Sequence, residues 1–293
     1  MSKKFYYGGQ AVIDGVMMRG RRVMVTAVRR PDGGVAIDSQ PLSGIYSGRM
    51  RRIPLWRGIV VLIEALVLGI NSLLYSANVS LGEEEARISG WLVWLLVLVS
   101  LGVAVALFFI APLFLTGLLT PYISSSIVFN LIEGLIRAAI FIAYLESINF
   151  IPDIRRVFAY HGAEHKAVNA YEDGALLEVE TAKRYNKAHV RCGTSFLFAV
   201  LIIAIIVFAL TGRPSLWLMV LWRVLLIPVI AALAYEVIYF GNRHIDNKIA
   251  RAVLAPGLWL QSLTTREPDD SQLEVALSAL KRVVELDEGG EAA

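Results

Sequence analysis

The sequence predicts a mostly helical, polytopic membrane protein with about four transmembrane helices, a small cytoplasmic β-containing N-terminal segment, and a non-spanning amphipathic or broken helix. Of its 293 residues, 56% are hydrophobic, and the mean hydropathy is +0.60. This is too apolar for an ordinary soluble domain. Several apolar runs are long enough to cross a bilayer, and most Lys and Arg residues lie outside them. The first residues are polar, so we expect no cleavable signal peptide.

Residues 1–57 form a basic segment with a predicted β-hairpin. They contain eleven Lys and Arg against three Asp. Two β-rich runs, Val23–Val28 and Val35–Ile37, flank the turn sequence PDGG at 31–34. The glycines lack the spacing of a nucleotide-binding loop. Basic residues beside membrane helices favour contact with anionic lipid head groups, and we expect no nucleic acid partner.

Residues 58–90 are predicted to form an interfacial or re-entrant helix followed by a charged linker. The apolar run at 57–77 is interrupted by Glu64 and Asn71, which are costly in a helix that crosses the hydrocarbon core. The sequence EEEAR at 83–87 then ends the apolar pattern.

Residues 91–147 contain the first two predicted transmembrane helices. The stretch from Trp91 to Leu119 has no charged side chain, and Pro112 should kink it. The second span, Ile127–Leu145, carries Glu133 and Arg137 at helical spacing. We expect these two side chains to pair inside the bundle, because a lone charge there is expensive.

Residues 148–193 are a polar cytoplasmic loop with a predicted helix. Pro152 is favourable at the first position of a helix and Gly174 is favourable just after its end, which predicts a helix of about 20 residues between them. The helix contains the sequence YHGAEHKAVNAYE at 160–172.

Residues 194–240 contain the third and fourth spans, and residues 241–293 form a cytoplasmic tail. We expect the third span at Ser195–Leu210 and the fourth at Trp217–Phe240. Three residues interrupt the fourth span: Arg223, Pro228 and Glu236. In the tail, 271–286 has the apolar periodicity of an amphipathic surface helix.

The distribution of basic residues predicts the orientation. The N-terminal segment, the 148–193 loop and the start of the tail are rich in Lys and Arg, whereas the short turns between spans hold only Arg213. The positive-inside rule therefore places both termini and the middle loop in the cytoplasm. Four spans give this parity and a fifth at 57–77 would not, so we expect 57–77 not to cross.

The pattern H-x-x-E-H is the strongest functional signal in the chain. It is formed by His161, Glu164 and His165. Residues four apart share one face of a helix, so the two imidazoles could bind one divalent metal, with zinc the best match for this signature. Glu164 would point the same way and could act as the catalytic base.

Further ligands for this metal are sought among three residues. His189 and Cys192 have the H-x-x-C spacing of a ligand pair, and Glu236 could supply a carboxylate as in the inverse zincins. His189 and Cys192 together would close a structural site, whereas a single third ligand would leave a position for water.

Simpler interpretations of the same residues remain open. The two helical histidines could be ordinary hydrogen-bonding surface residues. Cys192 could be a small buried side chain, and Glu236 could pair with an Arg or His inside the bundle.

Three motifs resemble the YqhQ-like family of bacterial membrane proteins. They are QAVIDGVMMRG near the start, AYHGAEHKAVNAYE in the middle and RCGTSF before the third span. The resemblance runs from Gly8 to Glu267. The family is of unknown function and is described as predicted metal-dependent enzymes, so the resemblance implies an inner-membrane protein that binds a metal.

The leading hypothesis is a membrane-embedded, metal-dependent hydrolase with its site at the cytoplasmic face of the membrane. The first alternative is a non-enzymatic scaffold or assembly factor with a structural His/Cys cluster. The second is a transporter, for which the broken apolar segments would be the evidence. The bilayer is the expected partner, and a homo-oligomer is compatible with the sequence.

The predicted topology can be tested with single cysteines introduced along the chain. Cysteines at Ser124 and Pro214 should react with a membrane-impermeant maleimide added outside intact cells. Cysteines at Ser39 and Asp270 should react only after the membrane is opened. Labelling of the Ser39 position from outside would refute the predicted orientation.

Overall fold

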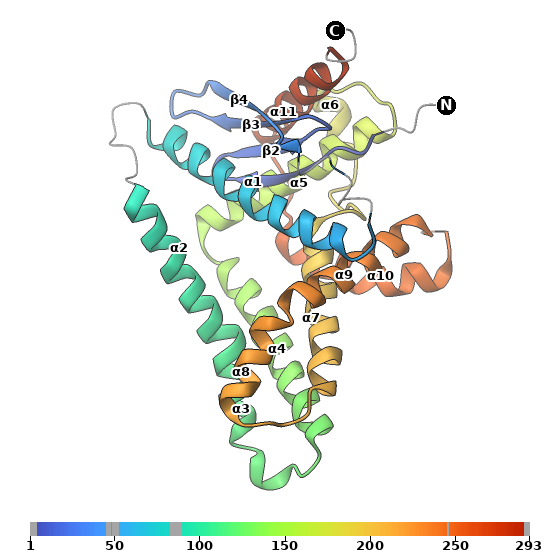
Figure 1. Cartoon of the computed structure of the whole chain (residues 1–293). Coiled ribbons are helices and arrows are strands. Elements are labelled where there is room, and N and C mark those ends of the chain that lie inside the picture. The colour runs from blue at the N-terminus through green and yellow to red at the C-terminus, as the bar shows by residue number, and fades with distance from the viewer. Residues whose placement is uncertain (1–4, 45–47, 49–52, 83–89, 245, 290–293) are drawn as a thin grey trace.

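The computed structural model describes residues 5–44, 48, 53–82, 90–244 and 246–289. It consists of a small sheet with helices on both faces, placed at one end of a bundle of long apolar helices (Figure 1). The charged sequence EEEAR at 83–87, predicted to be a linker, lies outside the described residues.

The elements follow one another in a simple order along the chain. The strands are β1 (Gly8–Val12), β2 (Gly15–Arg19), β3 (Val23–Arg29) and β4 (Val35–Pro41). The first half of the helical part contains α1 (Trp56–Leu81), α2 (Gly90–Val105), a π-helical turn (Ala106–Ile110), α3 (Ala111–Gly117), a 3-10 turn (Thr120–Tyr122), α4 (Ser126–Ile148) and α5 (Pro152–Glu172). The second half contains α6 (Val179–Ala182), α7 (Gly193–Leu210), α8 (Leu216–Leu225), α9 (Ile227–Arg243), α10 (Lys248–Thr264) and α11 (Asp270–Gly289).

The sheet is an antiparallel meander in the order β1-β2-β3-β4. The predicted hairpin is confirmed, since β3 pairs with β4 and Arg29 lies opposite Val35. Gly33 in its turn has a φ of 88°, a conformation that glycine adopts at little cost. The strands β1 and β2 extend the sheet beyond the predicted hairpin.

Helices cover both faces of the sheet, because its strands alternate apolar side chains between the two faces. On one face, Val16, Met18 and Val25 pack with Leu273 and Leu280 of α11. On the other face, four strand residues pack against Leu68 of α1: Val12, Met17, Met24 and Val28. The amphipathic helix predicted at 271–286 is therefore α11, and its apolar stripe completes the core of the sheet.

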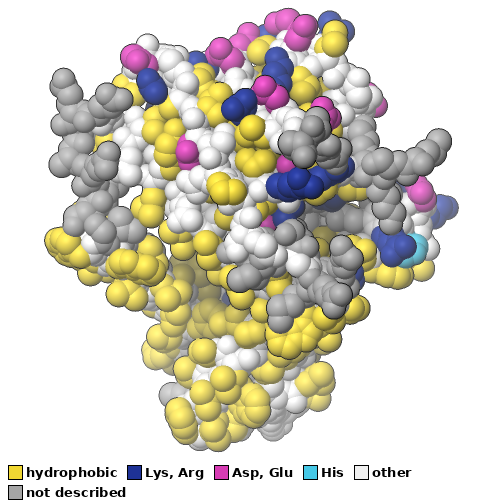
Figure 2. Space-filling view, turned by 45° about the horizontal axis from the view of Figure 1, so that its top comes forward, with side chains coloured by type: hydrophobic (Ala, Val, Ile, Leu, Met, Phe, Trp, Pro, Cys, Tyr) yellow, Lys and Arg dark blue, Asp and Glu magenta, His cyan; other side chains and the backbone are white. Residues whose placement is uncertain are grey.

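Among the described residues, five segments are apolar and long enough to cross a membrane. Four are helices, Trp56–Leu81, Trp94–Gly117, Ser126–Ile148 and Gly193–Leu210, and the fifth is the pair α8–α9, which bends by 44°. The chain is thus a multi-pass membrane protein. Hydrophobic side chains cover the narrow end of the molecule and charged side chains gather over the sheet (Figure 2).

Helix α1 differs from the other candidate spans in its arrangement. It lies across the end of the bundle and against the sheet, whereas α4 and α7 run along the bundle (Figure 1). Its polar residues serve the sheet: Glu64 pairs with Arg19 at 2.9 Å, and the Ser72 hydroxyl lies 3.2 Å from that of Thr26. Its opposite side exposes large apolar residues. This arrangement favours the predicted interfacial position over a crossing.

A π-helical turn lies next to Pro112 in the first long apolar segment, where the sequence predicts a kink. The π-helical turn at 106–110 comes just before this proline, which is near the start of α3. Proline cannot donate the backbone hydrogen bond that a continuous helix requires, and a π-turn is one way to accommodate it.

A buried charge cluster lies inside the bundle. The predicted contact between Glu133 and Arg137 is confirmed, and Arg223 of α8 binds the other oxygen of the same carboxylate. Arg137 also donates to the carbonyl of Phe108 at 2.9 Å. Both guanidinium groups lie within 5.3 Å of the centre of the Phe208 ring. One carboxylate therefore balances two cations, and carbonyl and ring electrons provide the remaining stabilisation.

This cluster predicts an unequal effect of removing its members. Glu133→Gln leaves two guanidinium groups without a counter-charge, so it should lower the melting temperature in detergent by the equivalent of about 3–5 kcal/mol. Arg137→Gln leaves the Glu133–Arg223 pair intact and should cost less. Glu146→Gln, on the exposed face of α4, is the matched control and should shift stability by about 0.5 kcal/mol or less. Equal melting temperatures for the two glutamate variants would show that the cluster does not stabilise the bundle.

Candidate metal centre

Three potential metal ligands meet where the sheet-containing part joins the bundle. They are His161 and His165 of α5 and Cys192, the residue that precedes α7. One ligand atom from each lies within 4.8 Å of those of the other two. The helix begins at Pro152 and is followed by Gly174 with a φ of 75°, as its end signals predict. The two histidines therefore share one face of a regular helix.

Backbone carbonyls fix the orientation of both imidazoles. Nδ1 of His161 lies 2.9 Å from the oxygen of Thr264, and Nδ1 of His165 lies 2.6 Å from the oxygen of Lys187. A carbonyl can only accept, so each Nδ1 carries the proton and donates. In the neutral rings, each Nε2 then keeps its lone pair, which is the usual arrangement of metal-binding histidines.

The Nε2 atoms, which do not bind the carbonyls, form a compact group with the thiol of Cys192. Nε2 of His161 lies 3.2 Å from Sγ of Cys192. The His165 side chain is only 1% exposed, and its Nε2 has no hydrogen-bond partner among the described residues. A buried nitrogen without a partner is expensive. A cation bound between the three ligand atoms would satisfy it.

The surroundings of Cys192 favour the thiolate form of its side chain. It is 7% exposed and caps α7, its sulfur accepting from the backbone N–H of Thr194 at 3.3 Å. Burial raises the pKa of Cys192, but the hydrogen bond from His161 and the positive charge of His161 and His165 outweigh burial and lower it to about 4. A helix N-terminus adds to this effect.

The same interactions act in the opposite direction on His165. Burial lowers the pKa of His165, but Glu164 and the Cys192 sulfur raise it more strongly, to about 9. The raised pKa of His165 and the lowered pKa of Cys192 both favour positive charge on the imidazole beside negative charge on the sulfur. A divalent cation would compete with a proton at this position, because ligands generally release protons when they bind metal.

Glu164 connects this cluster to the sheet. It is 4% exposed. Its Oε1 accepts from the backbone N–H of Gly9 at 2.9 Å, and its Oε2 lies 3.4 Å from Nε2 of His165. A side chain at Gly9 would collide with the carbonyl of Met17 and crowd Glu164, so glycine allows β1 to pass this closely. No pattern in the sequence predicted that the N-terminal sheet reaches this site.

His189 lies close to the cluster but outside the group of three. The centre of its ring is 5.7 Å from that of His165. Its Nε2 instead lies 3.6 Å from a Glu172 oxygen and 3.4 Å from Arg191. The Gln261 side chain binds both backbone groups of His189, at 2.9 and 3.0 Å. The H-x-x-C spacing thus brings one of its two members into the group.

The structure gives Glu236 another partner. Its carboxylate accepts from Nε of Arg57 at 2.7 Å and from the backbone N–H of Leu55 at 2.9 Å. This contact ties α1 to α9. The carboxylate predicted as a third ligand is therefore engaged in an ion pair, as the simpler interpretation expected, and it is not part of the group of three.

The other polar residues of the YHGAEHKAVNAYE motif hold the segment before α7 in place. Lys166 donates to the carbonyl of Lys183 at 2.8 Å. Asn169 donates to the carbonyls of Asn186 and Ala188 at 2.7 and 3.1 Å. These contacts fix the loop whose Lys187 carbonyl orients His165, so they position a ligand that they do not touch.

Gly162 allows another segment of the chain to pack closely against the opposite side of α5. A Cβ at this position would overlap the carbonyl oxygen of Arg266. The Arg266 N–H donates to the Phe158 carbonyl at 2.9 Å. The strap at 264–268 therefore lies directly on α5, which brings the Thr264 carbonyl to His161.

Comparisons with known proteins find one matching family model and one similar protein. Residues 53–286 match the model of a family described as "Protein of unknown function (DUF1385)". The chain is 37% identical to the "Uncharacterized protein YqhQ" of Bacillus subtilis (strain 168), over 96% of this chain and 93% of that protein. No solved structure matches.

The close contact at Gly162 can be tested by adding one methyl group. Gly162→Ala should displace the strap and the Thr264 carbonyl, with a loss of about 1–3 kcal/mol in stability and weaker zinc binding. Gly193→Ala is the matched control, since a Cβ there meets no atom within 4 Å. Thermal unfolding and zinc titration of both variants provide the comparison. Wild-type behaviour of Gly162→Ala would contradict the packing described for the strap.

Proposed function

This chain belongs to the DUF1385 family, and we propose that it is a membrane-embedded, metal-dependent hydrolase with its site at the cytoplasmic face of the inner membrane. One observation carries the proposal: two imidazoles with carbonyl-bound Nδ1 atoms share a buried space with a thiol of lowered pKa. Two histidines and one cysteine form a ligand set that suits zinc, and three protein ligands leave a fourth position open.

His161, His165 and Cys192 would hold the ion through two Nε2 atoms and one sulfur. A bound zinc ion supplies Lewis acidity and makes water acidic enough to react at neutral pH. The residues supply the other requirements. The Thr264 and Lys187 carbonyls keep the rings in one orientation, which limits the reorganisation needed on binding.

Glu164 is the proposed proton acceptor. Its Oε2 faces the ligand group at 3.4 Å from His165 Nε2, while Gly9 holds the other oxygen. A carboxylate in this position can take a proton from an attacking water and later return it to a leaving group. Its burial excludes bulk solvent, which strengthens its electrostatic interactions.

The cytoplasmic placement rests on the charge distribution. The loop that carries the site and the N-terminal segment are rich in Lys and Arg, and such segments stay on the cytoplasmic side. The same basic residues would contact anionic lipid head groups. Both termini then lie in the cytoplasm.

A structural metal in a non-enzymatic scaffold or assembly factor is the second candidate. It is favoured by the burial of the cluster and by the distance of 3.4 Å between Glu164 and His165, because a small shift would make Glu164 a fourth ligand. Four protein ligands close a site. A transporter receives less support, since the charges of the Glu133 cluster bind one another.

Elemental analysis of purified protein after zinc supplementation tests the metal centre. Wild type should contain zinc, and His165→Ala and Cys192→Ala should lose it. His244→Ala, which changes the one histidine outside the 161–192 stretch, is the matched control and should keep it. Metal-free wild type, or zinc retained by His165→Ala, would refute the proposed site.

Glu164→Gln separates the two candidate functions. The hydrolase proposal expects this variant to keep zinc and to lose about 10²–10⁴-fold in the rate of hydrolysis of acyl and phosphoryl ester probes. Loss of zinc from Glu164→Gln would make Glu164 a ligand and favour the scaffold. A zinc-loaded wild type that hydrolyses none of the probes would also favour the scaffold.

A further inference from the structure

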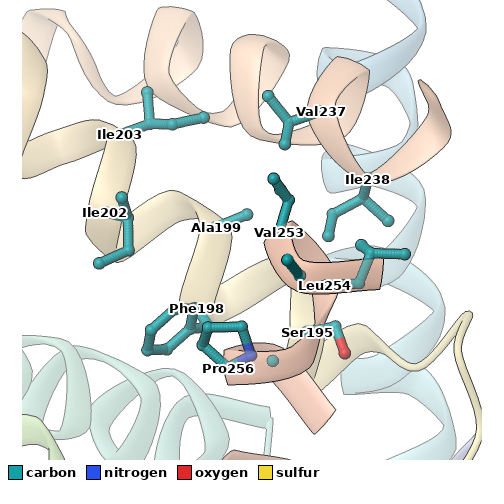
Figure 3. Close-up of a pocket in the computed structure, with 12 residues that line it drawn as sticks. Ser195, Phe198, Ala199, Ile202, Ile203, Val237, Ile238, Val253, Leu254 and Pro256 are labelled. Carbon is teal, nitrogen blue, oxygen red and sulfur yellow. The ribbon is translucent and has the colours of Figure 1, made fainter. Parts of the chain in front are cut away.

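A second feature next to the metal centre is an apolar pocket of about 350 Å³ between α7, α9 and α10 (Figure 3). This volume lies near the lower end of the range found for ligand sites. Helix α7 contributes one continuous stripe at helical spacing, namely Ser195, Phe198, Ala199, Ile202 and Ile203. The pocket therefore extends along the helix axis, which suits an extended chain better than a compact ligand.

The pocket has an open rim and a closed floor. At the rim, Val253 of α10 is 54% exposed. At the floor, Ala199 and Leu254 are buried. Helix α7 is a candidate membrane span and α9 belongs to the bent pair, so two of the three helices around the pocket are apolar enough to lie within a bilayer. A lipid chain could reach the pocket along these two helices without crossing water.

Ser195 is the polar side chain among the residues that line the pocket. It is 2% exposed, and its Oγ has no hydrogen-bond partner among the described residues. Ser195 lies three residues after Cys192 in the chain, and it contacts Gly257 of α10. A buried hydroxyl needs an acceptor, and an ester carbonyl of a bound lipid would supply one at the end of the pocket nearest the metal ligands.

Three basic residues lie in the sequence between the α9 residues and the α10 residues that line the pocket. Arg243 ends α9, and Lys248 and Arg251 begin α10. All three are exposed, and Arg251 precedes the lining residues Ala252 and Val253. Positive charge at the membrane surface attracts phosphate head groups. This complementarity selects a phospholipid over an uncharged hydrocarbon.

We propose that this pocket binds one acyl chain of an anionic phospholipid from the bilayer, with its phosphate near the basic residues of the α9–α10 turn and an ester carbonyl at Ser195. Binding does not depend on the metal. The next step rests on the proposed hydrolase activity. Ester-bearing membrane lipids are then its substrate class, because the pocket brings the ester to the end of α7 that follows Cys192.

Photo-crosslinking in nanodiscs tests the binding. The full chain is placed in phosphatidylcholine with a minor fraction of phosphatidylglycerol that bears a diazirine on one acyl chain. After irradiation, mass spectrometry should locate adducts mainly on the peptides of α7 and α10 that line the pocket. Unlabelled phosphatidylglycerol should compete better than phosphatidylcholine.

Three variants sharpen this experiment. Ala199→Trp fills the floor and Val253→Trp fills the exposed rim, where added bulk cannot disturb the interior, so both should reduce the pocket adducts several-fold. Leu197→Trp, on the opposite exposed face of α7, is the matched control and should not. Ser195→Ala should keep the melting temperature, because the hydroxyl has no protein partner, and should lower the adduct yield.

Two results would overturn the proposal. One is labelling spread evenly over all lipid-facing helices, which would indicate ordinary bilayer contact. The other is equal pocket labelling in Val253→Trp and Leu197→Trp. His165→Ala should retain the adducts. Failure of the metal centre therefore leaves the lipid result intact, and loss of lipid labelling leaves the zinc analysis intact.

Discussion

The Nδ1 hydrogen bond of His165 to the Lys187 carbonyl is the constraint around which the junction is arranged. It fixes which nitrogen remains available, and the buried Nε2 then has no hydrogen-bond partner in the part of the chain that the structure describes. Such a group costs about 1–3 kcal/mol unless something satisfies it. The neighbouring thiol has a lowered pKa, so the space between these ligand atoms favours a positive charge, from either a proton or a metal ion.

The metal centre lies where two parts of the chain meet, one suited to water and the other suited to the hydrocarbon of a bilayer. The sheet with α11 has an ordinary protein core, whereas the bundle is suited to hydrocarbon. Helix α5 is common to both. One side carries Glu164 under Gly9 of the sheet, and another carries His161 against the strap that follows α10. A site shared in this way couples its geometry to the docking of the two parts, since displacement of either would move a ligand-orienting group.

Local signals in the sequence predicted local structure well. The turn glycines, Pro152 and the i, i+4 spacing of His161 and His165 depend on neighbours in the chain, and the structure follows them. The Arg57 partner of Glu236 and the second partner of Glu133, Arg223, could not be predicted, because Arg57 lies 179 positions away from Glu236 and Arg223 lies 90 positions away from Glu133. The carbonyls that orient the histidines belong to backbone, which leaves no trace in residue type.

The burial of the centre bears on how it could work. In the proposed hydrolase, a site closed on the side of the sheet, where Glu164 lies under β1, would receive its substrate from another direction. Helix α10 connects the two features that remain: Gly257 contacts Ser195 at the pocket, and Thr264, about two turns later, binds His161. One helix face thus contacts both the lipid-accessible pocket and a ligand of the metal centre. A membrane lipid, as proposed for the pocket, would meet this requirement better than a soluble substrate, because α7 and α9, which line the pocket, belong to candidate membrane spans.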